Sequence, residues 1–344
     1  MAPLNSLSRG RSPSLHEKIV LLLRIARPRT WLFAIVSFLF AYLEGGNPVG
    51  WQMLLGTIVF ALGTGATNMI NAYTDMAEDS VNNPFRLDWI RRYGTARLIR
   101  ATLAAYCLVA LLALPLGLAF TSVVLLAVAD SVFYSLPPVR LKKNPITALL
   151  AFSGAVGLPF LAGRAVVGSL RLLDPWFYLF TIFMLTYGTV KNVPDFLGDD
   201  LAGLKTTATA FKDFRKAVTA STMLLLAPYL LMILFIGTGL LDRIFLFDLC
   251  LLLVPLYWAR ENVRSNRREA LEKLHTLGFL YALSFLLVNL ILCYPTFTSV
   301  AITVSVSFAV SVVYKLNVDS RMELPFNAYG AKLDGSERLG IHRD

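Results

Sequence analysis

Charged residues are scarce in this chain. Only 16% of its 344 residues are Asp, Glu, Lys or Arg, whereas 56% are hydrophobic, and the mean hydropathy is +0.62. Soluble globular proteins carry about a quarter charged residues. The shortage of charge therefore argues against soluble domains and predicts a protein whose solvent is largely lipid.

Cysteine and histidine are also few. Cys107, Cys250 and Cys293 lie in apolar segments without CxxC or Cys–His spacing. Disulfide frameworks and zinc sites need such patterns, so the sequence supports neither. The three histidines lie far apart in the chain, and none has a partner at metal-ligand spacing.

The N-terminal segment shows no signal-peptide pattern. Residues 1–26 contain one short apolar patch, but no apolar core followed by a small-residue cleavage site. We interpret residues 1–29 as a cytosolic N-terminal segment that contains a lead-in helix. An organellar targeting sequence stays open as an alternative, because Glu17 is the first acidic residue.

Long apolar runs dominate the rest of the chain. A helix needs about 20 predominantly apolar residues to cross a bilayer. The runs predict an all-α, polytopic membrane protein of nine to ten transmembrane helices, with residues 296–314 as a possible extra helix. The candidate spans are residues 30–46, 51–73, 101–119, 121–137, 145–164, 175–193, 217–238, 244–259, 276–294 and 297–314. Residues 315–344 are polar and predict a flexible cytosolic tail.

The net charge is +10, and the basic residues are distributed unevenly between the two sides of the predicted membrane topology. If the N-terminus is cytosolic and ten spans follow, 29 of the 32 Lys and Arg residues lie on the cytosolic side. Only Arg164, Arg171 and Arg243 lie on the other side. Because loops rich in Lys and Arg stay cytosolic, the charge indicates orientation in a bacterial inner membrane or an organelle membrane. It gives no indication of a nucleic-acid partner.

An acidic cluster lies at the cytosolic end of the predicted second span. Asn71, Asp75 and Asp79 are spaced four residues apart, and Asn68 precedes Asn71 by three residues. At about 100° per residue, these side chains share one helix face. Neighbouring carboxylates on one face repel each other unless a cation lies between them. The spacing therefore indicates a cation site.

A second cluster lies at the cytosolic end of the predicted sixth span. Asp195 and Asp199 share a face, with Lys191 one turn before them. Both clusters then lie on the same side of the membrane. This arrangement suits Mg²⁺, which binds one or two carboxylates together with phosphate oxygens and water. For either cluster alone, a solvated helix end is an equally good explanation.

Basic residues follow these clusters. Arg86 comes after the first cluster, Lys205 after the second, and Arg140 and Lys142 after the predicted fourth span. Guanidinium and ammonium groups bind phosphate, so these residues predict contacts with a diphosphate. Membrane anchoring by positive charge stays open for Arg140, Lys142 and Lys143.

Together these motifs resemble those of the UbiA superfamily of intramembrane prenyltransferases. The resemblance covers about residues 20–295 and implies a helix bundle around a central cavity that opens to lipid. The family motifs RPxT, NxxxDxxxD, YSxPPxRLK, DxxxD and GDxxxGxKT are similar to residues 27–30, 71–79, 134–142, 195–199 and 198–206.

The resemblance also implies roles for these residues. Tyr134 would stabilise a developing carbocation through its ring. The implied ligands of two Mg²⁺ ions are Asn71, Asp75, Asp79, Asp195 and Asp199. The implied substrate contacts are Asn68, Asn71, Arg86, Arg140, Lys191 and Lys205. The candidate catalytic residues are Asp75, Asp79, Asp195, Asp199, Tyr134 and Lys142.

Three features depart from the family pattern. The loop around Arg86 lacks the Pro and the Gly-containing turn of many members, and Asp200 stands where a basic residue is common. Residues 297–314 add an apolar run. The loop is expected to cap the site, so its departure leaves the acceptor open.

The implied activity is transfer of a prenyl group from a prenyl diphosphate to an aromatic or other lipophilic acceptor, by the helix bundle of residues 30–295. A terpene cyclase of the same family stays open, since it would use the same motifs without an acceptor. A cation-coupled transporter is a third alternative. It would need acids near helix midpoints, where the sequence offers Asp130.

Overall fold

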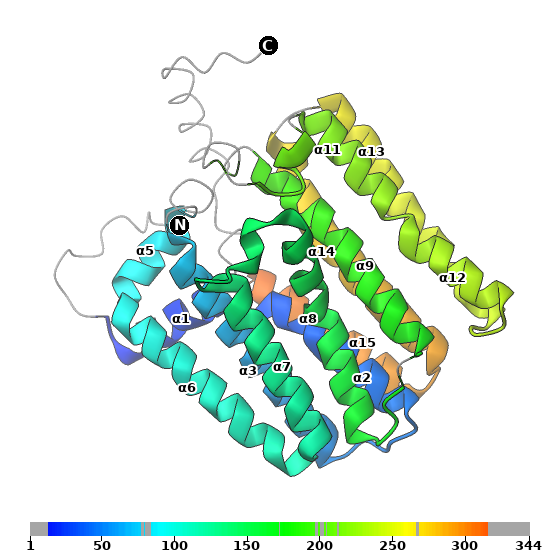
Figure 1. Ribbon diagram of the computed structural model, residues 1–344, viewed down its shortest axis with the longest axis horizontal. Coiled ribbons are helices and arrows are strands. Elements are labelled where there is room, and N and C mark those ends of the chain that lie inside the picture. The colour runs from blue at the N-terminus through cyan, green and yellow to red at the C-terminus, as the bar shows by residue number, and fades with distance from the viewer. Residues whose placement is uncertain are drawn as a thin grey trace.

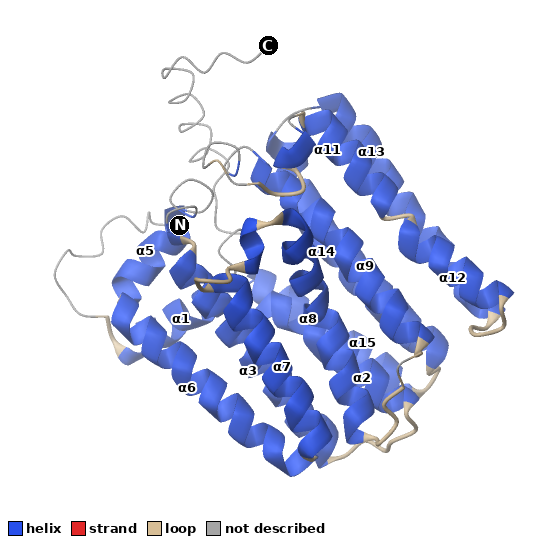
Figure 2. Ribbon diagram, viewed as in Figure 1, coloured by secondary structure: helices blue, strands red, loops and turns tan. Residues whose placement is uncertain are grey.

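The computed structural model describes residues 13–76, 79, 84–171, 173–196, 199, 203, 205–211, 213–265 and 268–315. Over these residues the chain is helical and contains no strand (Figure 2). The α-helices are α1 (Leu15–Ala26), α2 (Pro28–Glu44), α3 (Trp51–Thr74), α5 (Pro84–Tyr93), α6 (Thr95–Ala113), α7 (Leu118–Ser135), α8 (Pro145–Val166), α9 (Pro175–Asn192), α11 (Phe214–Leu224), α12 (Ala227–Gly237), α13 (Leu253–Ser265), α14 (Arg268–Cys293) and α15 (Phe297–Lys315). The 3-10 helices are η2 (Leu114–Leu116), η3 (Leu141–Lys143), η4 (Val193–Asp195), η5 (Thr209–Phe211) and η6 (Arg243–Leu252). The predicted tail after Lys315 lies outside the described residues.

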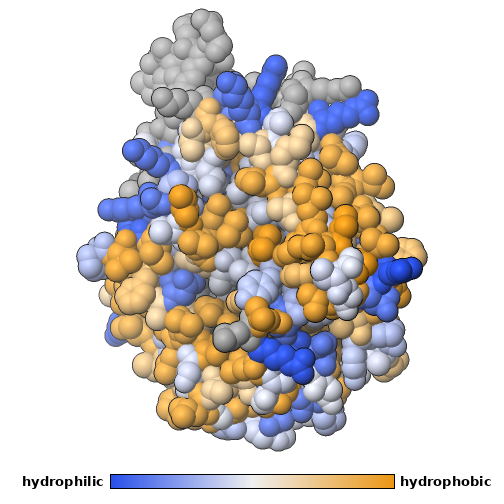
Figure 3. Space-filling view, turned by 45° about the vertical axis from the view of Figure 1, so that its right-hand side comes forward, coloured by the Kyte–Doolittle hydropathy of each residue, from blue (hydrophilic) through white to orange (hydrophobic). Residues whose placement is uncertain are grey.

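Seven helical segments among the described residues are long and apolar enough to cross a membrane. Large apolar side chains stand exposed on them, such as Leu118 at 84% and Phe297 at 87%. Figure 3 shows hydrophobic side chains covering much of one face of the molecule. The chain is therefore an integral membrane protein with an all-α bundle, as predicted. The seven segments are Trp51–Thr74, Thr95–Leu116, Leu118–Ser135, Pro145–Val166, Phe214–Gly237, Thr276–Cys293 and Phe297–Lys315.

Three of the predicted spans are not among these seven, although each is helical. The span at 30–46 becomes α2, which has 17 residues, and the span at 175–193 becomes α9. The span at 244–259 becomes the 3-10 helix η6 followed by α13. A total of nine to ten transmembrane helices thus remains a prediction. The uncertain last run does form a helix, α15.

Proline and a polar cap set the start of two helices that lead to or from the candidate site. Pro145 and Pro175 occupy the first turns of α8 and α9, where a missing N–H costs nothing. The Asn144 side chain accepts from the Ile146 N–H at 2.9 Å, and Asp174 accepts from the Trp176 N–H at 3.0 Å. These caps satisfy donors that a helix start leaves open.

Helix α2 runs through the middle of the bundle and packs closely on α8. Figure 1 shows α6 and α12 on opposite sides of this centre. The Ser37 hydroxyl of α2 donates to the Val156 carbonyl of α8 at 2.8 Å. A Cβ on Gly163 would lie only 2.7 Å from the Phe38 carbonyl oxygen, so glycine allows the two backbones to approach. Small residues serve this purpose where membrane helices cross.

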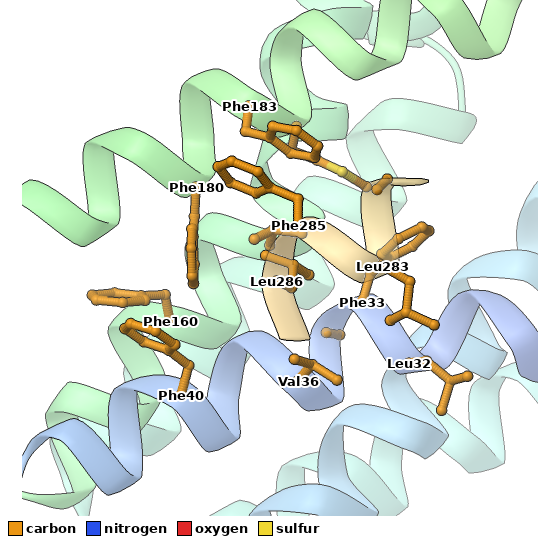
Figure 4. Packing of buried hydrophobic residues seen from close by; sticks show 14 of the residues in the cluster. Leu32, Phe33, Val36, Phe40, Phe160, Phe180, Phe183, Leu283, Phe285 and Leu286 are labelled. Atoms are coloured by element: carbon orange, nitrogen blue, oxygen red, sulfur yellow. The ribbon is translucent and has the colours of Figure 1, made fainter. Parts of the chain in front are cut away.

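Aromatic side chains fill the core between α2, α8, α9 and α14 (Figure 4). Phe183 and Phe285 stack with ring centroids 3.8 Å apart, and Phe40 meets Phe180 edge-on at 4.7 Å. Such pairs contribute about 0.5–1.5 kcal/mol each beyond the area that they bury. These contacts hold α9 against α2, so the ends of the two helices keep a fixed position relative to each other.

A buried ion cluster joins α2, α8 and α9 at the end of α8 that lies away from the acidic motifs. The Arg164 Nε and Nη2 atoms lie 2.8 and 2.7 Å from Asp174 Oδ2, and Nη1 pairs with Glu44. The side chains of Arg164 and Asp174 are 8% and 3% exposed. Because Asp174 also caps α9, the cluster links the start of α9 to the end of α8.

We expect Arg164→Ala to lower stability substantially. Removing one partner of a buried ion pair leaves the other charge uncompensated, at a cost of about 3–5 kcal/mol. The measurement is the melting temperature of the detergent-purified protein. Arg171→Ala removes an exposed arginine from a nearby position and should leave the melting temperature unchanged. Equal melting temperatures for all three proteins would contradict this role of the cluster.

Candidate active site

The end of α3 and the 3-10 helix η3 meet around Asp75. The Lys142 ammonium forms an ion pair with Asp75 Oδ1, and Arg140 Nη2 lies 3.8 Å from the same oxygen. Lys142 Nζ also donates to Thr74 Oγ1 at 3.0 Å and to Asn71 Oδ1 at 3.4 Å. Four residues predicted for the site, Asn71, Asp75, Arg140 and Lys142, therefore lie together.

Asp79 continues the first motif and pairs with Arg86. The two side chains are 3.0 Å apart and only 10% and 5% exposed, respectively. Arg86 Nη2 also donates to the Asn68 carbonyl at 3.2 Å, which ties α5 to α3. The Asp79 N–H donates to the Asp75 carbonyl at 2.7 Å, so helical geometry carries both carboxylates to one end of α3.

Asn68 anchors α3 to the start of α2. Its amide nitrogen donates to the Ala26 carbonyl at 3.0 Å, to Thr30 Oγ1 at 2.8 Å and to the Thr64 carbonyl at 2.9 Å. These bonds occupy the donors of the amide. Asn68, which was predicted as a substrate contact, thus positions α3 against the RPxT motif at the start of α2.

The second motif follows the end of α9. Asp195 closes η4, and Asp199 is 7% exposed. Both carboxylates lie within electrostatic reach of the Tyr134 hydroxyl on α7. Lys191 Nζ lies 4.6 Å from the centroid of the Phe152 ring. Tyr134 and the second motif are therefore neighbours.

A cavity of about 190 Å³ begins beside these residues and extends into the bundle. The cavity is lined by Asn68 and Asn71 of the first cluster, by Lys191 one turn before the second motif, and by Tyr134. The two predicted clusters thus border one space. The walls are mostly apolar and aromatic, including Phe33, Val59, Phe60, Tyr106, Val109, Val124, Phe152, Leu158, Met184, Tyr187 and Phe279.

Lys205 stands apart from this group. Its side chain is exposed and forms no ion pair with the other described residues. A phosphate contact from Lys205 therefore remains a prediction. The Asn192 amide instead links the second motif to the segment after it, because it donates to Thr207 Oγ1 at 3.0 Å.

Several residues at the site were not among the site residues predicted from the sequence. Arg29 is 1% exposed, lines the cavity and lies 5.2 Å from the Phe279 ring centroid. Ser135 donates to Asn71 Oδ1 at 3.3 Å. Asp130 lines the cavity one turn before Tyr134. A charged residue within an apolar helix was the available signal for Arg29 and Asp130.

Burial changes the chemistry of Lys142. It lowers the pKa of the ammonium group to about 7, because desolvation disfavours the charged form. A diphosphate arriving beside this amine would favour its charged form again. Binding of an anionic headgroup beside Lys142 would therefore raise the pKa of this amine.

The donor set fits Mg²⁺. Asn71, Asp75, Asp79, Asp195 and Asp199 all offer oxygen, the ligand atom that this ion prefers. Among the described residues, no three or more His, Cys, Asp or Glu side chains gather into one metal-binding group. Mg²⁺ does not require such a group, because one or two carboxylates with phosphate oxygens and water complete its shell.

Residues 30–286 match the UbiA prenyltransferase family. This match covers well over half of the chain, and the chain belongs to that family. The resemblance inferred from the motifs is confirmed.

Curated relatives show the same membership. A 2-acylphloroglucinol 4-prenyltransferase of Humulus lupulus is 32% identical in an alignment of 181 positions that covers 48% of this chain and 44% of that protein. The chain thus matches less than half of the hop enzyme's length. A digeranylgeranylglyceryl phosphate synthase of Natronomonas pharaonis is 30% identical in an alignment of 230 positions that covers 62% of this chain and 79% of that protein.

A solved structure shows the same fold. A UbiA homolog from Archaeoglobus fulgidus, bound to GPP and Mg²⁺, superposes with a TM-score of 0.60 at 19% identity. The alignment covers 78% of this chain and 99% of that one.

Proposed function

We propose that this protein is a Mg²⁺-dependent prenyltransferase that moves a prenyl group from a prenyl diphosphate to a lipophilic acceptor. One observation carries the proposal: a single apolar cavity is lined both by Asn71 of the first acidic motif and by Lys191, one turn before the second. A prenyl diphosphate has a charged head and a hydrocarbon tail. We call the end of the cavity beside Asn71 and Lys191 its mouth. The charged groups around the mouth and the apolar walls are complementary to these two parts.

The mouth binds the diphosphate through opposite charges. Guanidinium and ammonium donors come from three residues that pair with aspartates of the first motif: Arg86, Arg140 and Lys142. The four aspartates of the motifs, with Asn71, would hold Mg²⁺. When bound, the metal supplies Lewis-acid stabilisation of the charge that grows on the leaving diphosphate.

The cavity protects the allylic cation that remains. Its apolar walls exclude water, which would otherwise add to the cation. Tyr134 lies beside the second motif and lines the cavity, so its ring can stabilise the cation near the broken bond. The prenyl tail stays in the apolar interior throughout.

Family membership and the bundle favour this activity over a cation-coupled transporter. The comparisons add support, because the hop relative is named a prenyltransferase and the archaeal relative is named for a product that carries geranylgeranyl groups, which are prenyl groups. We further propose that the mouth faces the cytosol. The predicted segments on the side of the two motifs hold 29 of the 32 Lys and Arg residues, and segments rich in these residues stay cytosolic.

Metal removal tests the proposal. Purified protein with geranyl diphosphate and a panel of acceptors should release diphosphate and form a prenylated product in Mg²⁺. With EDTA the product should fall to background and return when Mg²⁺ is added in excess. Turnover that persists in EDTA would contradict the metal role. Hydrocarbon formed from geranyl diphosphate alone would instead identify a terpene cyclase.

A further inference from the structure

Asp130 is an acidic side chain inside the cavity that the proposed ionisation step does not use. It lies on α7, is partly buried, and is the one acidic residue among the described residues that line the cavity. It forms no hydrogen bond or ion pair with another described side chain. A carboxylate in a membrane helix is costly, so its presence indicates a function.

The position of Asp130 follows from its neighbours on α7. Ser135, at the end of this helix, donates to Asn71 of the first motif. Tyr134 lies within electrostatic reach of the second motif, and also of Asp130. Asp130 is four residues earlier, about 6 Å along the helix axis. It therefore lies just inside the mouth, where the cavity becomes apolar.

The neighbouring helix α8 leaves space for this carboxylate at Gly154. A Cβ placed on Gly154 of α8 would lie 3.0 Å from Asp130 Oδ2 and 3.6 Å from Cγ. The carboxylate thus rests against bare backbone of α8. Next to it, the Tyr106 and Ser131 hydroxyls bond to each other at 2.6 Å.

We propose that Asp130 binds the hydroxyl group of a neutral phenolic acceptor and takes the proton that transfer releases. This inference rests on the proposed prenyl transfer. A carboxylate accepts a hydrogen bond from a phenol, whereas it repels an anionic acceptor group. Tyr106, Tyr134 and Phe152 also line the cavity, and aromatic walls suit a planar ring.

The step balances as follows. The bond between prenyl C1 and the diphosphate oxygen breaks, and its electron pair leaves with diphosphate. A ring carbon of the acceptor bonds to C1 while the phenol proton moves to an Asp130 oxygen. The ring regains aromaticity when the proton on the alkylated carbon moves to the phenol oxygen. Asp130 returns its proton to water at the mouth.

The test compares acceptor-dependent and acceptor-independent chemistry in one preparation. The probes are geranyl diphosphate with Mg²⁺, a 2-acylphloroglucinol, its fully O-methylated ether, and a geranylgeranylated glyceryl phosphate. We expect Asp130→Asn to lower kcat for transfer to the 2-acylphloroglucinol by about 100-fold, as the loss of a general base does. Slow diphosphate release from geranyl diphosphate alone should be unchanged.

Two further variants sharpen the comparison. Asp248→Asn removes another buried acid, which does not line the cavity, and should leave transfer unchanged. Gly154→Ala keeps the carboxylate but forces it to move, and should also slow transfer. Wild type should prefer the free phenol to its methyl ether, and Asp130→Asn should lose this preference.

Each other outcome has a definite meaning. Wild-type transfer by Asp130→Asn, or an equal fall in donor-only diphosphate release, overturns the role of Asp130. Preference of the wild type for the glyceryl phosphate over the phenol overturns the acceptor class, as does a wild type that releases diphosphate but prenylates none of the offered acceptors. If the wild type releases no diphosphate under any condition, the proposed function itself fails.

Discussion

We expect Asp75→Asn and Asp195→Asn to lower diphosphate release from geranyl diphosphate at least about 100- to 1,000-fold each, the loss typical when one preorganised electrostatic group is removed. Asp75 lies within the group formed with Asn71, Arg140 and Lys142. Asp195 belongs to the second motif. If both carboxylates hold metal against one diphosphate, either loss disrupts ionisation. The measurement is the initial rate of diphosphate release at saturating Mg²⁺.

A matched control separates this effect from a general loss of negative charge. Asp88 is exposed on α5, close in sequence to the first motif. Asp88→Asn should retain the wild-type rate. Wild-type rates for both motif variants, or a loss in only one of them, would show that the two motifs do not act on the same diphosphate.

The second large effect concerns Lys142. We expect Lys142→Gln to lower kcat about 100-fold or more, because an ammonium group that neutralises the leaving diphosphate is lost from a site largely shielded from water. Its side chain is 13% exposed and contacts three residues at the end of α3. The measurement is kcat together with the Kd of geranyl diphosphate.

Lys143 provides the control for Lys142. It follows Lys142 in the same 3-10 helix, but it is exposed. Lys143→Gln should therefore behave as the wild type. Equal effects of the two substitutions would indicate that these lysines act only as membrane anchors, the alternative that the sequence left open.

The fold could be predicted well from the sequence because apolar runs and prolines mark helix boundaries. Pro28, Pro145 and Pro175 each begin a helix close to its predicted start. The interruption between α11 and α12 was less visible, since Pro228 lies within an otherwise continuous apolar run. A proline inside such a run removes a helical hydrogen bond. Hydropathy averages over such local breaks.

The candidate site could be predicted where spacing reflects one helix face. Asn71 and Asp75 lie together for this reason. Their partners Arg140 and Lys142 come from a segment more than 60 residues later, and only the charge and the motif pointed to them. The buried ion cluster could not be foreseen, because its members Arg164, Glu44 and Asp174 come from three different helix ends.

The central claim is that the two motifs hold one diphosphate between them. A structure of the protein with Mg²⁺ and a non-ionisable thiolodiphosphate analogue of geranyl diphosphate tests it most directly. We predict one diphosphate whose metal ions contact Asp75 or Asp79 on one side and Asp195 or Asp199 on the other, with the geranyl chain in the cavity. A diphosphate bound at one motif alone, with its chain outside the cavity, would contradict the account.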